Sequence, residues 1–128
     1  MDYRVQQVIR TMKSDLADEV CPSDLAQVVN LSYSHLRHLF TVETGLSPAQ
    51  YLKMLRMQHA RQLLEETFLS VKQIMTMVGL KDESHFVRDF KRMYGVSPTN
   101  HRLHYLQNTV RDTEVSKVAV YNRRGFDS

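Results

Sequence analysis

Residues 25–48 read LAQVVNLSYSHLRHLFTVETGLSP, and residues 74–98 read IMTMVGLKDESHFVRDFKRMYGVSP. The two segments follow one pattern. Val29 and Leu31 match Val78 and Leu80 at an offset of 49, and an offset of 50 then pairs Ser34 with Ser84, His35 with His85, Phe40 with Phe90, Gly45 with Gly95 and Ser47-Pro48 with Ser97-Pro98. The extra residue falls before Ser84, where a turn of variable length is expected. Two copies predict two similar units joined by a connector, not a solenoid.

The first helix of each copy is marked by residues that start and stop helices. In the first copy Ser23 is the expected N-cap and Asn30 the expected stop. In the second copy residues 70–73, Ser-Val-Lys-Gln, have the spacing of a capping box, and Gly79 is the stop. Asn and Gly best tolerate the positive φ that a tight turn between helices demands. Each copy is therefore predicted to begin with a short helix and a tight turn.

A second helix is predicted after the turn in each copy. Ser32 and Asp82 are its expected N-caps, and Gly45 and Gly95 are its expected ends. Apolar residues recur at helical spacing on one face, namely Leu36, Leu39 and Phe40 in the first copy and Phe86, Phe90 and Met93 in the second. These faces should be buried, which leaves a polar face outward.

A long connector separates the copies. Ser-Pro follows each stop, as an N-cap and a proline at the first helical position, and residues 47–50 also have capping-box spacing. The connector helix is predicted from about Pro48 to Glu66. Its apolar stripe is formed by Leu52, Leu55, Ala60, Leu63 and Leu64. Since no Gly, Ser or internal Pro interrupts it, we expect a rigid link.

The predicted fold is all-α, with about seven helices and two helix-turn-helix subdomains joined by the long linker helix. The chain has only 4 Gly and 3 Pro in 128 residues, too few for many tight turns. An N-terminal helix is expected over about residues 2–18, with Val5, Val8, Ile9, Met12 and Leu16 on its apolar face. We divide the chain into a first subdomain with the linker helix (1–66, linker 48–66), a second subdomain (67–110) and a flexible tail (111–128).

The charge of the chain is mildly basic and unevenly spread. The formal net charge is +3, and residues 22–102 carry 10 Lys and Arg against 7 Asp and Glu. Such a balance is compatible with a polyanionic partner. The single cysteine, Cys21, excludes an intrachain disulfide, and no apolar run approaches the roughly 20 residues of a membrane span. The start of the chain lacks the order of a signal peptide, so we expect a cytoplasmic protein.

A short helix, a tight turn and a second helix with a polar outer face are typical of a helix-turn-helix. In that motif the second helix lies in the DNA major groove and the first helix supports it. A small residue in the first helix allows the two helices to approach closely. Ala26, four residues before Asn30, suits this position, whereas the equivalent Met75 suits it less well.

The stretch from Leu25 to Arg102 resembles the AraC/XylS-type DNA-binding domain. The residues that carry the resemblance are Leu36 to Phe40, Glu43 to Pro48, Tyr51 to Arg56, Ala60 to Leu64, Val78 to Leu80, Phe86, Phe90 to Arg92, Tyr94 to Pro98 and Arg102. They lie in the expected order over the whole stretch. The resemblance implies a transcription regulator that binds double-stranded promoter or operator DNA through both units, which the linker helix places on one face of the duplex.

Base-reading residues are expected on the outer faces of the two second helices. Arg37 is the first choice, because a guanidinium can bond both acceptors of a guanine edge, and Ser34 and His38 are second choices. Contact with phosphate alone is the alternative for Arg37. In the second unit the resemblance implies contacts from Ser84, Val87 and Arg88. An ion pair of Arg88 with Glu83 or Asp89 is the alternative there.

Contacts to the DNA backbone are expected from helix N-termini and from polar or charged side chains. The candidates are Tyr33, Thr41, Lys53, Arg56, Lys72, Lys81, Glu83, Lys91, Arg92 and Arg102. Each charged member could instead be an ordinary surface charge. Arg56 lies in the apolar region of the connector, so a buried structural pairing is its particular alternative.

Other functions have less support in the sequence. His35 and His38, like His101 and His104, have a spacing that can bind zinc, but no Cys or carboxylate cluster completes either set. No Gly-rich phosphate loop, nucleophile elbow or paired-carboxylate motif is present, so we expect neither an enzyme nor a cofactor. A protein-interaction module that binds RNA polymerase or another regulator remains an alternative, and it should expose an apolar patch.

The two outer faces differ in sequence, which predicts that one chain reads an asymmetric site as a monomer. The recognition helices should lie roughly 34 Å apart, one turn of the duplex. We interpret the chain as a stand-alone regulator or the C-terminal domain of a longer one.

Overall fold

The chain folds into α-helices, and the computed structural model describes residues 1–14, 16–17 and 21–109. The helices with defined bounds are α1 (Tyr3–Ser14), α2 (Pro22–Val28), α3 (Tyr33–Thr44), α4 (Pro48–Glu66), α5 (Val71–Val78) and α6 (Glu83–Tyr94). A seventh helical stretch covers residues 98–109, and the described residues contain no strand. The predicted all-α class is confirmed. The tail predicted at 111–128 lies outside the described residues.

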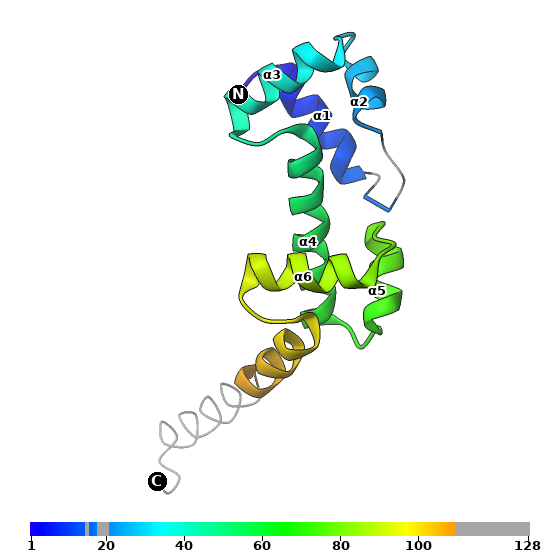
Figure 1. Cartoon of the computed structure of the whole chain (residues 1–128), viewed down its shortest axis with the longest axis vertical. Coiled ribbons are helices and arrows are strands. Elements are labelled where there is room, and N and C mark those ends of the chain that lie inside the picture. Colours follow the sequence, from blue (N-terminus) through cyan, green and yellow to red (C-terminus); the bar gives the residue numbers. More distant parts are fainter. Residues whose placement is uncertain (15, 18–20, 110–128) are drawn as a thin grey trace, which may run out of the picture.

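Helix α4 is the axis of the molecule (Figure 1). Helices α1, α2 and α3 gather around its N-terminal half, and α5 and α6 gather around its C-terminal half. The helical stretch 98–109 leaves the molecule at the end farther from α3. The two helix-turn-helix units, α2–α3 and α5–α6, therefore follow one another along a single helix.

The first core joins α1, α2 and α3 to the N-terminal half of α4. Its buried residues are Val5, Val8, Ile9, Met12, Leu25, Ala26, Leu36, Phe40, Leu52 and Leu55. The ring of Phe40 meets the ring of Tyr51 edge to face, with centroids 5.3 Å apart. Full burial of each large apolar side chain contributes about 1.5–3 kcal/mol, so this small unit gains most of its stability here.

The second core joins α5 and α6 to the C-terminal half of α4. Its buried residues are Met57, Ala60, Leu64, Ile74, Met75, Val78, Phe86 and Phe90. Phe90 meets His101 edge to face at 5.5 Å, which repeats the Phe40–Tyr51 contact at the offset of 50 residues. Helix α4 thus turns one stripe of side chains to the first core and another to the second, so both units share it.

The turns between the paired helices have the geometry that their residues predict. Asn30 has φ 56° and Gly79 has φ 80°. Just after them, the amide of Leu31 donates to the carbonyl of Ala26 at 3.0 Å, and the amide of Leu80 donates to the carbonyl of Met75 at 2.8 Å. Both Ala26 and Met75 are buried. The flexible methionine side chain is therefore accommodated in the second unit at the position where a small residue was expected.

The predicted caps of the second helices and the connector are present. Ser32 Oγ accepts from the amide of His35 at 3.2 Å, and Asp82 Oδ1 accepts from the amide of His85 at 3.0 Å. Ser47 forms a capping box with Gln50, and Ser70 forms one with Gln73. Gly45 and Gly95, at φ 80° and 85°, end α3 and α6.

Replacing Ser47 by alanine is expected to lower the free energy of unfolding by about 1 kcal/mol. The hydroxyl satisfies the amide of Gln50 at the start of α4, the helix that both cores share. Urea unfolding followed by circular dichroism measures the effect. Ser34→Ala, an exposed serine inside α3, is the matched control and should change stability by less than about 0.5 kcal/mol. Equal effects of the two substitutions would contradict the capping role.

Two predicted helix bounds were wrong. Helix α1 ends at Ser14, not near Asp18, and Leu16 and Ala17 form a turn. Leu16 packs against the first core although it lies outside α1. Its apolar side chain fits the helical spacing, and this is why the helix was predicted to extend beyond Ser14. Helix α2 begins at Pro22 with Cys21 at the N-cap, because the fixed φ of proline suits the first helical position. Ser23 is therefore not the N-cap.

The burial of two methionines differs from the sequence prediction. Met93, predicted on the inner face of α6, is 42% exposed. Met57, which the apolar stripe of the connector did not include, is buried in the second core. Met57 was missed because α4 presents two different faces, so a single stripe does not describe its burial. Met93 instead lines an open apolar groove with residues of α4.

Candidate nucleic-acid interface

The outer face of α3 carries the residues that were predicted to meet DNA in the first unit. Ser34, Arg37, His38 and Thr41 are exposed, while Leu36 and Phe40 on the same helix are buried. Tyr33 is partly buried and packs against the first core. The helix thus separates an apolar inner side from a polar outer side with one cation, Arg37, near its middle.

The outer face of α6 is more strongly charged. Ser84, Arg88, Lys91, Arg92 and Glu83 are exposed, and Val87 is partly buried. The buried residues of α6 are Phe86 and Phe90. Helix α6 therefore carries five of the cationic or neutral side chains that were predicted to contact DNA, and the acidic Glu83 lies at its start.

Asp89 lies among the cations of α6 and is only 11% exposed. Its Oδ2 is 2.7 Å from Lys53 Nζ on α4, and its Oδ1 is 3.9 Å from Arg88 Nε. The hydrogen bond from Lys53, helped by the charges of Lys53, Arg88 and Arg92, holds the pKa of Asp89 below its usual range despite burial. The close partner of Asp89 is thus Lys53, and the contact with Arg88 is the longer one.

The guanidinium of Arg56 forms a hydrogen bond within the protein. Its Nε donates to the backbone carbonyl of Leu16 at 3.1 Å, across 40 residues of sequence. Burial lowers the pKa of this guanidinium. The structural pairing that stood as the alternative for Arg56 is therefore present.

The guanidinium of Arg102 also binds backbone carbonyls of the protein, at the C-terminal end of α4. Its Nε donates to the carbonyl of Leu64 at 3.0 Å, and its Nη2 donates to the carbonyl of Thr67 at 3.3 Å. These are carbonyls at the C-terminal end of α4, where intrahelical donors run out and a positive charge is favourable. Sequence reasoning assigned Arg102 to phosphate and missed this structural role, because the bond joins residues 35 or more positions apart.

The remaining predicted backbone contacts lie on the surface. Lys72 is exposed in the first turn of α5, and Lys81 is exposed between α5 and α6. Lys91 and Arg92 are exposed in the last turn of α6. These four cations belong to the second unit, so the positive charge available to a polyanion is concentrated there.

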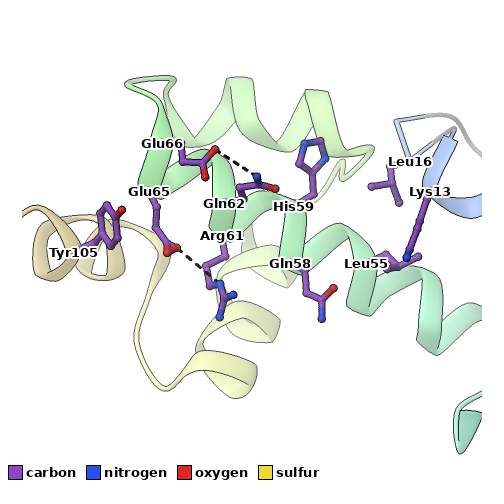
Figure 2. Close-up of a pocket in the computed structure, with 10 residues that line it drawn as sticks. All are labelled: Lys13, Leu16, Leu55, Gln58, His59, Arg61, Gln62, Glu65, Glu66 and Tyr105. Atoms are coloured by element: carbon purple, nitrogen blue, oxygen red, sulfur yellow. Dashed lines mark hydrogen bonds and ion pairs between the residues drawn. The ribbon is translucent and has the colours of Figure 1, made fainter. Parts of the chain in front are cut away.

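The described residues also contain an open depression of about 710 Å³ along α4, with no residue of α3 or α6 in its lining (Figure 2). Its lining includes Gln58, His59 and Gln62, and the amide of Gln62 reaches Glu66 at 3.4 Å. No group of three or more His, Cys, Asp or Glu side chains suited to a metal occurs within 1–14, 16–17 and 21–109. None of the helices in these ranges has the length and apolarity of a membrane span.

Similarity to known proteins covers the two helix-turn-helix units and the helix between them. A family model described as "Helix-turn-helix domain" matches residues 25–104. The lactose operon transcription activator of Staphylococcus xylosus is 33% identical over 104 residues, which are 81% of this chain and 37% of that protein. The chain thus spans little more than a third of the length of this relative.

Solved structures share the fold. A transcriptional regulator from Chromobacterium violaceum, described by its AraC-type DNA-binding domain, has a TM-score of 0.76 and 27% identity, over 81% of this chain and 93% of that one. The DNA-binding domain of AdpA, solved in complex with a target DNA, has a TM-score of 0.79 and 24% identity, over 84% and 96%. The chain belongs to the AraC-type family of helix-turn-helix transcription regulators.

Proposed function

We propose that the chain binds double-stranded DNA sequence-specifically and so regulates transcription, with α3 and α6 in adjacent major-groove segments on one face of the duplex. The observation that carries this proposal is the shared construction of the two helices. Each has a capped start, buried apolar side chains on one side and exposed polar side chains on the other. The AdpA domain, which has the same fold, binds a target DNA, and this supports the proposal.

We assign base reading to three residues of each recognition helix. Arg37, with Ser34 and His38, reads the first segment, and Arg88, with Ser84 and Val87, reads the second. The exposure of these side chains, Val87 partly excepted, supports the assignment. Because the two sets differ, an asymmetric site bound by a monomer fits them best.

Phosphate contacts are proposed for the exposed cations Lys72, Lys81, Lys91 and Arg92, with Tyr33 and Thr41 of α3 as neutral contacts. Glu83 is left out of the set, because its carboxylate would be repelled by a phosphate. Arg56 and Arg102 are left out of the set because their guanidinium groups bind backbone carbonyls of the protein. Lys53 contributes less than a solvated lysine would, since Asp89 neutralises part of its charge.

We propose RNA polymerase as the protein partner, because a regulator bound at a promoter would act on it. We also propose that the chain works in the cytoplasm. A module that only binds proteins would present an apolar patch in place of the recognition faces. The outer faces of α3 and α6 instead carry Arg37, Arg88 and their polar neighbours. This observation favours DNA as the ligand, and we assign no catalytic role to the chain.

Selection of bound sites from random duplexes tests the proposed function. The selected duplexes should share two short sequence elements about one helical turn apart. Affinity for them, measured by fluorescence anisotropy, should exceed affinity for unrelated DNA by about 10³-fold or more and should fall steeply with salt. Recovery of duplexes without a common sequence, bound as weakly as random DNA, would count against sequence-specific recognition.

Asp89→Asn is expected to strengthen binding to selected and unrelated duplexes alike. It removes a carboxylate from the basic side of α6 and releases Lys53, which can then meet a phosphate. The slope of log affinity against log salt should steepen by about 1. Glu66→Gln, which removes the same charge from the end of α4, is the control and should leave the slope unchanged. Weaker binding by Asp89→Asn would contradict this expectation. It would show that the Lys53–Asp89 ion pair helps binding by positioning α6, and that this effect exceeds the repulsion between Asp89 and DNA.

A further inference from the structure

The turn formed by Leu16 and Ala17 touches the second helix-turn-helix unit, although it follows α1 of the first. A Cβ atom built on Gly79, in the turn between α5 and α6, would lie 2.6 Å from the carbonyl oxygen of Leu16 and 3.1 Å from that of Ala17. The backbone of the two units is therefore in contact at this point. Arg56, on the shared helix α4, holds the same Leu16 carbonyl by its hydrogen bond of 3.1 Å.

The contact lies where it can control the angle between the units. The side chain of Leu16 packs on the first core, and α1 is part of that core with α3. Gly79 ends α5, and α6 begins four residues later at Glu83. Restraining Gly79 against the Leu16–Ala17 turn therefore restrains the start of α6 relative to the frame that holds α3.

Both sides of α4 are open where the two units meet. The depression of about 710 Å³ includes Leu16 in its lining, and an apolar groove of about 300 Å³ on another face of α4 has Leu46 from the α3–α4 turn and Met93 from α6 in its lining. The buried cores themselves share no helix other than α4. Because α4 is the one helix that belongs to both cores, a backbone contact beside it adds a second restraint on how the two units are oriented.

We propose that the Leu16–Ala17 turn, held by Arg56 and abutting Gly79, is a brace that sets the spacing of the two DNA elements the chain reads. This inference rests on the proposed binding of DNA by both units. One inserted base pair moves one element by about 3.4 Å and rotates it by roughly 35° relative to the other. A braced pair of recognition helices cannot follow that change, whereas a loosened pair can.

The experiment compares Gly79→Ala with Gly45→Ala. Both substitutions place alanine at φ +80° at the end of a helix, but a Cβ at Gly45 meets nothing within 4 Å. For each chain we would measure affinity for a duplex selected by the wild-type chain and for the same duplex with one base pair added or removed between its elements. The ratio of these affinities is the readout, since a general loss of stability lowers both and leaves the ratio unchanged.

The wild-type chain and Gly45→Ala should lose about 5- to 150-fold on the altered spacing, the range typical of a mismatched base pair. In Gly79→Ala the loss should shrink to about twofold or less. A Gly79→Ala ratio equal to that of the wild-type chain would overturn the brace. If Gly79→Ala does not fold, Arg56→Met, which removes the donor to Leu16 without adding a clash, decides by the same ratio. A wild-type chain indifferent to spacing would also overturn the brace. A wild-type chain that does not prefer the selected duplex over unrelated DNA would instead contradict the proposed function.

Discussion

Phe90→Ala is expected to lower the free energy of unfolding by about 3–5 kcal/mol. Phe90 has no exposed surface and lies at the centre of the second core, with ring centroids 5.8 Å from Phe86, 4.7 Å from Tyr94 and 5.5 Å from His101. The substitution leaves a cavity among rings that cannot collapse into it, because they come from α6 and from the helix after it. Urea unfolding measures the loss.

Phe68→Ala is the matched control for this substitution. It removes the same atoms from a side chain that is 92% exposed in the loop between α4 and α5. Its stability should stay within about 0.5 kcal/mol of the wild-type value. If the two variants were equally stable, the second core would not depend on the aromatic cluster in the way its packing indicates.

Arg37→Ala is expected to weaken binding to a selected duplex by about 1–3 kcal/mol, roughly 5- to 150-fold, at fixed salt. The exposed guanidinium on the outer face of α3 can bond both acceptors of a guanine edge, and alanine offers nothing in its place. The loss should be accompanied by relaxed preference at one base pair of the first element. Anisotropy titrations with duplexes changed at single positions measure both effects.

Arg10→Ala supplies the comparison, since it removes from α1 an arginine that is also exposed. It should change affinity little and should leave the preference at every base pair intact. Should Arg37→Ala bind the selected duplex as tightly as the wild-type chain does, its assignment as a base reader is wrong. A uniform loss across all duplexes would assign Arg37 to phosphate instead.

The helices and turns of this chain could be predicted because their signals are local. Ser32, Ser47, Ser70 and Asp82 all cap the helices that they precede, and each bond spans three residues. Asn30 takes the positive φ that the turn pattern required. Helical spacing likewise identified the buried residues of α1, α3 and α6.

What escaped prediction depends on residues far apart in the chain. The bonds from Arg56 to Leu16 and from Arg102 to Leu64 span 40 and 38 residues, and the pair of Lys53 with Asp89 joins different helices. From charge and spacing these cations were assigned to DNA, with a buried pairing as the alternative for Arg56 only and with no partner identified. Whether a surface cation faces phosphate or a carbonyl is decided by how helices pack, and that information is not in the local pattern.

The central claim is that one chain reads two DNA elements, one with α3 and the other with α6. Its most direct test changes each element of a selected duplex in turn and measures binding by the wild-type chain, Arg37→Ala and Arg88→Ala at one salt concentration. The wild-type chain is expected to lose affinity for either change. Arg37→Ala should become insensitive at one position of one element, and Arg88→Ala at one position of the other. If both variants responded in the same element, or if one element carried all the affinity, the account would be contradicted.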